Sequence, residues 1–251
     1  MQPVKPLLVR GKDLAPLHMR EHTIGGFKCG RVCAGCNNGW MSKLEDDIKA
    51  ILIGVIEGSR PLNGLNENER FLLARWTLKT VAALNRSSTY GDPRREDARV
   101  MPEAHLRTLK AGTMPAEVLI VATIFREFTK PFDFLQNAIW TNPKNSMSLE
   151  EEHRNQSYKI GLSFGQLILI AAYYPSHEYF YGINTKAHFP LCSGRRIVPM
   201  DHIWDDSPGK SLAPHLEVPM RNVSVISQTW QRLVDNVAFT SLADPFGLGF
   251  R

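Results

Sequence analysis

The second half of the chain decides the fold class, and its clearest stretch is residues 158–174, which read YKIGLSFGQLILIAAYY. Aliphatic and aromatic residues of high strand propensity lie on both sides of a Gly-Gln pair. We therefore predict two strands, Tyr158–Leu162 and Gln166–Tyr174, which meet at a turn around Gly165. Three further strands are expected from the same kind of pattern, at Glu117–Phe125, Tyr179–Ile183 and Arg196–Val198.

The first half of the chain has the spacing of amphipathic helices. From Asn37 onward, apolar residues recur at intervals of three and four, at Trp40, Leu44, Ile48, Ile51, Leu52 and Val55. A second helix is expected after Asn66, whose side chain can cap it, and a shorter one between Pro102 and Gly112. Ser224–Phe239 predicts a closing amphipathic helix. The fold class is therefore α+β, with helices first and a mostly antiparallel, β-rich half over residues 117–198.

Length and composition are those of a globular protein. The chain has 251 residues, 43% of them hydrophobic and 22% charged, which excludes general disorder. Its apolar runs are too short to span a bilayer, and its N-terminus lacks the hydrophobic stretch of a signal peptide. We therefore expect a soluble, cytoplasmic protein with no membrane partner. Residues 1–45 are expected to form a small module, and residues 46–251 an α+β body.

Positive charge is concentrated near the N-terminus. Residues 1–43 hold seven Lys and Arg side chains against two acidic ones, whereas the remaining 208 residues hold 23 of each kind. A local excess of positive charge attracts the phosphates of nucleic acid, whatever the base sequence. Lys28, Arg31 and Lys43 are the candidate nucleic-acid-binding residues. The alternative is a solvated, charged tail without a ligand.

Three of the four cysteines fall within eight residues, at Cys29, Cys33 and Cys36. A chain of this length with so few cysteines is not a disulfide scaffold, and clustered thiols more often bind a metal. Cys33 and Cys36 have the Cys-x-x-Cys spacing of a zinc knuckle, which lets both sulfurs reach one ion. His18 and His22 are further donors, and they share a face if their stretch is helical. We predict a structural zinc site with Cys29, Cys33, Cys36 and His18 as ligands.

An iron–sulfur cluster is the competing interpretation of the same cysteines. They also have the C-x3-C-x2-C spacing with which radical S-adenosylmethionine enzymes bind a four-iron cluster. Such enzymes resemble barrels of repeated β-α units, whereas here a helical stretch precedes paired strands. The sequence also lacks a glycine-rich cofactor motif downstream. Zinc is therefore favoured, and a radical enzyme is the third alternative.

Residues 32–45 read VCAGCNNGWMSKLE, which resembles the CxxCNNGWMSxLE segment of bacterial and phage proteins related to HNH endonucleases. Leu73–Trp76, with Lys79 and Thr80, resemble the helix that follows in that group. The resemblance extends over residues 21–84. It implies an HNH-like module, in which a β-hairpin and a helix typically hold one catalytic divalent ion while Cys pairs bind a structural zinc.

The resemblance also implies a reaction, which is metal-dependent hydrolysis of DNA phosphodiester bonds. Glu21-His22 matches the Glu-His that opens the family motif, so His22 is the candidate general base. Asn37 matches the position at which many HNH proteins have a metal-binding His or Asn. Mg²⁺ or Mn²⁺ would be the catalytic ion and would stabilise the leaving oxygen.

The sequence departs from the family pattern upstream of Cys33, where the N-terminal half of the module is missing or rebuilt. The family normally has another Cys-x-x-Cys before the Glu-His, and here only His18 and Cys29 could replace it. The spacer between His22 and Cys33, ten residues, is also shorter than usual. If both His18 and His22 bind zinc, no general base is left nearby. The alternative is then a catalytically silent zinc-stapled module that binds another protein, for example a phage-encoded inhibitor of a host system.

Overall fold

The computed structural model describes residues 7–9, 16–19, 32–88, 101–124, 133–137, 158–173, 179–183, 185, 188–195, 197–199 and 237–241. Its helices are α1 (Ala34–Cys36), α2 (Ser42–Ile56), α3 (Glu67–Ser88) and α4 (Glu103–Lys110). A π-helical turn at Asn37–Met41 joins α1 to α2, and a 3-10 turn at Leu62–Gly64 precedes α3.

Two sheets make up the β part of the described chain. The larger has seven strands in the order β2-β1-β4-β5-β6-β3-β8, and all its neighbours are antiparallel except β1 and β4. Its strands are β1 (Leu7–Val9), β2 (Pro16–Met19), β3 (Val118–Ile124), β4 (Asp133–Asn137), β5 (Tyr158–Phe164), β6 (Leu167–Tyr173) and β8 (Phe189–Ser193). The smaller sheet has the order β10-β7-β9, with β7 at Tyr179–Ile183, β9 at Ile197–Pro199 and β10 at Val237–Ser241.

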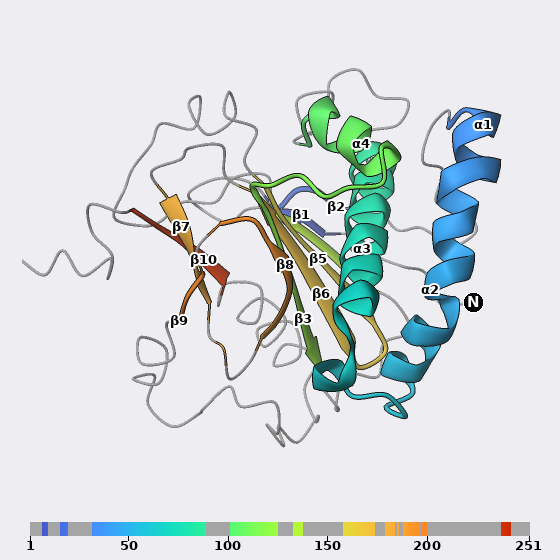
Figure 1. Cartoon of the computed structure of the whole chain (residues 1–251). Coiled ribbons are helices and arrows are strands. Elements are labelled where there is room, and N and C mark those ends of the chain that lie inside the picture. Colours follow the sequence, from blue (N-terminus) through green and yellow to red (C-terminus); the bar gives the residue numbers. More distant parts are fainter. Residues whose placement is uncertain are drawn as a thin grey trace, which may run out of the picture.

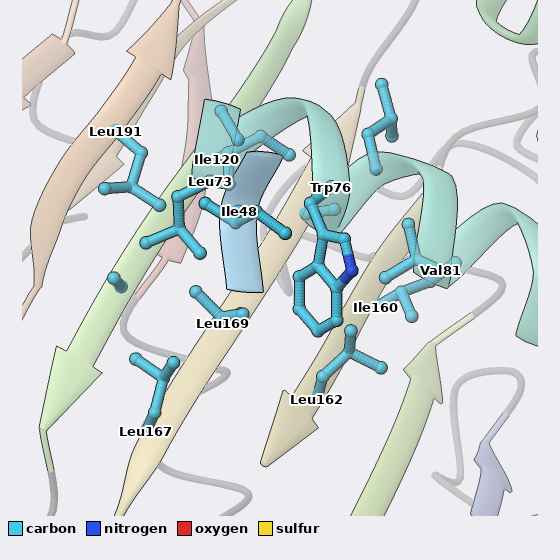
Figure 2. Packing of buried hydrophobic residues seen from close by; sticks show 14 of the residues in the cluster. Ile48, Leu73, Trp76, Val81, Ile120, Ile160, Leu162, Leu167, Leu169 and Leu191 are labelled. Carbon is cyan, nitrogen blue, oxygen red and sulfur yellow. The ribbon is translucent and has the colours of Figure 1, made fainter. Parts of the chain in front are cut away.

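The helices cover one face of the larger sheet (Figure 1). α3 lies against β3, β5, β6 and β8, and both α2 and α4 pack against α3. Every second strand residue, such as Ile160 and Leu169, packs in one cluster with Leu73 and Val81 of α3 (Figure 2). The positions between them, such as Ile170, are buried as well. Burial on both faces explains why these strands are apolar throughout rather than alternating.

The structure confirms the α+β class and most of the predicted elements. The helices predicted after Asn37, Asn66 and Pro102 are present as α2, α3 and α4. The strand pair around Gly165 is present as β5 and β6, and Gly165 adopts φ +56°, a conformation that favours glycine in so tight a turn. The other predicted strands are also present, as β3, β7 and β9.

One predicted helix is wrong over the described residues. Val237–Phe239, predicted to end the closing helix, lie in β10, where they pair with β7. Val237 and Phe239 are residue types of high strand propensity, which favours this backbone pairing over an isolated helical turn. The rest of the closing helix lies outside the described residues. His18 lies in β2, so the helical face suggested for His18 and His22 does not form over Pro16–Met19.

Besides β10, four strands were not predicted. β1 and β2 come from the N-terminal module of the sequence prediction, and they pair within the larger sheet. β4 has the polar sequence DFLQN, and β8 contains Pro190. Proline is tolerated in β8 because β8 lies at the edge of its sheet. Among the described helices, none is both long and apolar enough to cross a membrane.

α3, the helix that packs on the larger sheet, begins at a capping box formed by Asn66 and Glu69. The Glu69 N–H donates to Asn66 Oδ1, and the Asn66 N–H donates to Glu69 Oε2, each at 3.0 Å. Asn66→Ala should lower the free energy of unfolding by about 1 kcal/mol, as measured by chemical denaturation. Asn68→Ala, at an exposed position inside the same turn, is the control and should leave stability nearly unchanged. Equal losses in the two variants would contradict this role of Asn66.

Candidate metal and nucleic-acid site

Cys33 and Cys36 lie on one helical turn at the start of the described helical layer. Cys33 has extended backbone angles and caps α1, and its Sγ accepts a hydrogen bond from the Cys36 N–H at 3.2 Å. The Cys33 carbonyl oxygen accepts the N–H groups of Cys36 and Asn37, each at 3.0 Å. Both thiols are free; Cys33 is exposed and Cys36 is partly buried. The turn therefore presents two neighbouring sulfurs, one of which is open to solvent.

The surroundings of Cys33 favour its thiolate form. Hydrogen bonds from Cys36, first from its side chain and then from its backbone N–H, lower the pKa of the Cys33 thiol. The positive charge of Lys110, at the end of α4, also lowers this pKa. A thiolate is the form of cysteine that binds metals. The geometry is therefore suited to a metal ligand.

The helix is kinked directly after the cysteine pair. Asn37–Met41 form a π-helical turn, in which Gly39 has non-helical backbone angles (φ −102°, ψ −113°). The exposed Asn37 side chain donates to Asn38 Oδ1 at 3.3 Å. Trp40 is half-buried and packs against the core. The kink thus anchors Trp40 on the body and leaves the Asn37 amide at the surface beside Cys36.

An ion pair joins the two stretches that carry the resemblance. The Lys79 ammonium of α3 binds the Glu45 carboxylate of α2. The Lys79 side chain is only 8% exposed, whereas that of Glu45 is 57% exposed. Lys79 Nζ also lies 5.9 Å from the ring centroid of Trp76. A buried ammonium needs such partners, so this contact fixes how α2 sits on α3.

A buried His–Tyr cluster holds α4 on the sheet. His105 Nδ1 lies 3.0 Å from the Tyr158 hydroxyl, and the His105 ring meets Tyr173 edge-on, with 4.5 Å between ring centroids. Burial lowers the pKa of His105 to about 4, against the opposing effect of Glu117. Burial also raises the pKa of Tyr158 well above its usual value. Both groups are therefore neutral near pH 7.

The predicted site residues fall partly within the described chain. Cys33, Cys36, Asn37 and Lys43 lie between residues 32 and 43, and Lys43 is exposed in the first turn of α2. His18 lies in β2. The remaining predicted residues, His22, Lys28, Cys29 and Arg31, lie outside the described residues. Within the described residues, no three His, Cys, Asp or Glu side chains form a metal-binding group.

Sequence patterns did not predict the interactions of three residues in α3 and α4. The charge of Lys110 acts on the Cys33 thiol although 77 positions separate the two residues in the chain, and no local pattern links them. The contact of His105 with Tyr158 has no local signal either, because 53 positions separate the two residues. Lys79 did carry a signal. It lies three residues after Trp76 on the same apolar helix face, where a lysine needs an acidic partner.

Comparison with known proteins gives no independent support for any function. Protein-family models, curated proteins and solved structures contain no match to this chain. The resemblance of Cys33–Glu45 to HNH-related proteins therefore stays a prediction from the sequence.

His105 gives a prediction for pH dependence. Its pKa is lower in the folded chain, about 4, than in an unfolded chain, about 6.5, so the unfolded state binds the proton first. The stabilisation is complete above about pH 6.5 and is lost as pH falls toward 4, on the order of 2–3 kcal/mol. Denaturation of the wild type and of His105→Gln at pH 7 and pH 4.5 measures it. The variant should lose less stability on acidification, and an identical loss would contradict the assignment.

Proposed function

We propose that this chain is a zinc-binding protein related to HNH endonucleases and that it engages DNA. The observation that best supports zinc binding is the turn of Cys33 and Cys36. Both thiols are free, and the Cys36 N–H donates a hydrogen bond to the Cys33 sulfur. Zinc prefers thiolate ligands at this spacing, and an N–H···S bond is the kind of outer contact that stabilises a bound thiolate. This donor pair fits the proposed ion.

The rest of the zinc site is assigned to the segment before the turn. Cys29 and His18 would complete a tetrahedral set with Cys33 and Cys36, as the sequence predicts. When bound, the ion would supply a structural cross-link between this segment and the start of the helical layer. In this arrangement His22 does not bind zinc. It is therefore free to act as a general base.

DNA is the proposed partner because the basic excess of the chain lies in the same segment. Lys28, Arg31 and Lys43 would contact phosphates beside the zinc site. If the module also cleaves DNA, His22 would take the proton of the attacking water, and Asn37 would lie beside a divalent ion. The exposed amide of Asn37, next to Cys36, supports that position.

Metal analysis of the purified chain is the first test. We expect about one zinc per chain by mass spectrometry, lost in Cys33→Ser and in Cys36→Ser. Cys192→Ser is the matched control and should retain the zinc, because Cys192 lies in β8 and packs against the core. Iron with acid-labile sulfide would overturn the proposal in favour of the radical enzyme. A metal-free chain would overturn it as well.

Plasmid nicking then distinguishes an active endonuclease from a silent module. With Mg²⁺ or Mn²⁺, we expect His22→Ala to abolish nicking while zinc content stays at the wild-type level. Asn37→Ala should reduce nicking, with Asn38→Ala as the neighbouring control. Loss of zinc in His22→Ala would instead assign His22 to the structural site. A wild type that retains zinc but never nicks DNA would contradict the cleavage reaction and favour the silent module.

A further inference from the structure

The turn of Cys33 and Cys36, which we call the cysteine turn, has the geometry of a dithiol that can close into a disulfide. The Cys36 N–H donates to the Cys33 carbonyl oxygen at 3.0 Å, and such an i to i+3 bond holds the two Cα atoms within about 7 Å of each other. Disulfides span Cα separations of about 4.4–6.8 Å. Cys33 Sγ lies 3.2 Å from the Cys36 backbone nitrogen, so the Cys33 side chain is turned toward Cys36. The two sulfurs can therefore bond without unwinding the turn.

The cysteine turn is open to molecules in solution. Cys33 is exposed, and Cys36 is partly buried. Ala34 and Gly35 between them are exposed as well. Apart from the turn's own backbone, no described atom lies within 4 Å of the position that a Cβ on Gly35 would take. Figure 1 shows α1 at the margin of the helical layer. A small molecule can thus reach the Cys33 thiol first, with the Cys36 thiol next to it.

The loop that a Cys33–Cys36 disulfide would close is short, because only Ala34 and Gly35 separate the two cysteines. In the chain-entropy model, a disulfide stabilises a fold less as the loop that it closes becomes shorter. This disulfide would therefore contribute little to the stability of the fold. That favours a bond that forms and breaks reversibly over a structural one.

We propose that Cys33 and Cys36 form a thiol–disulfide exchange site whose substrate is a small-molecule disulfide. Cys33 attacks one sulfur of the substrate and forms a mixed disulfide with it, and the first substrate thiol leaves with the proton of Cys33. Cys36 then attacks Cys33 Sγ, forms the Cys33–Cys36 disulfide, and releases the second substrate thiol with its own proton. The protein loses two electrons and two protons, and the substrate disulfide is reduced to two thiols.

Oxidation and zinc binding exclude each other at the cysteine turn. Zinc binds cysteine as the thiolate, and a sulfur in a disulfide carries no thiolate charge. Of the four proposed ligands, only Cys29 and His18 would remain after oxidation, which are too few for a tetrahedral site. The exchange reaction would therefore release the ion. This consequence rests on the proposed function, whereas exchange at the cysteine turn does not.

Oxidation of the full-length chain by glutathione disulfide, after purification without oxygen, tests the site. Trypsin leaves Cys33 and Cys36 together in the peptide 32–43, whereas Cys29 and Cys192 fall in two other peptides. We expect the peptide 32–43 to lose two hydrogens, as measured by mass spectrometry. A colorimetric chelator should record the release of about one zinc per chain over the same time course. Dithiothreitol with added zinc should reverse both changes.

Two variants test the roles of the cysteines. Cys36→Ser should accumulate the mixed disulfide of Cys33 with glutathione, because no second thiol displaces the glutathione. In the wild type this species should stay minor. Cys192→Ser is the matched control and should oxidise and release zinc as the wild type does, since Cys192 lies in β8 and packs against the core. Thermal unfolding of each variant verifies that it is folded.

The possible outcomes separate this inference from the proposed function. A zinc-containing chain whose peptide 32–43 stays reduced overturns the exchange site and leaves the zinc proposal standing. Pairing of Cys33 with Cys29 overturns the exchange site as well, and so does a wild type that keeps glutathione on Cys33 as Cys36→Ser does. A chain that purifies without zinc but closes the Cys33–Cys36 disulfide overturns the zinc proposal and supports the exchange site.

Discussion

The packing of α3 onto the larger sheet is the contact on which the other parts of the described structure depend. Leu73, Leu78 and Val81 of α3 are completely buried, in one cluster with residues of the strands. Each such side chain contributes about 1.5–3 kcal/mol relative to full exposure. Because α3 also contacts α2 and α4, its position determines where those helices lie. A change in the α3–sheet interface would therefore move the cysteine turn and α4 together.

Two polar contacts fix the positions of α2 and α4 on α3, which apolar packing alone would leave less defined. Lys79 binds Glu45 and so fixes α2, while Arg75 binds the Leu109 carbonyl oxygen and so fixes the end of α4. Apolar packing is not directional, whereas a buried cation must meet its acceptor in one geometry. The two contacts come from one helix, four residues apart, and hence from one face of α3. The cysteine turn and the basic end of α4 are thus positioned by the same stretch of chain.

Local sequence patterns predicted the elements whose own residues carry a strong periodicity, cap or turn signal. The periodicity of α2, the Asn66 cap of α3 and the β5–β6 turn at Gly165 all lie within a few residues, and each prediction was confirmed. β4 and β8 depend on pairing with partners distant in the chain, and their polar or proline-containing sequences hide them. Likewise, the Cys33–Cys36 spacing is visible in the sequence, but the effect of the Lys110 charge on the Cys33 thiol is not. The cysteine pair was predictable because it lies on one turn of the chain. The groups that other helices contribute near it were not.

The contacts that each Lys and Arg side chain makes within the protein indicate which of them can bind a negatively charged ligand. Among the described residues, Lys79 binds Glu45, Arg60 binds Glu69, and Arg75 binds a carbonyl oxygen. These cations therefore donate their hydrogen bonds within the protein. A cation that leaves such a contact for a phosphate loses as much as it gains. Exposed cations with weak internal partners lose only water and mobile counterions, whose release favours binding. Arg60, Lys79 and Arg75, which hold the helices together, are therefore poor candidates for contact with a charged ligand, whatever the total charge of the chain.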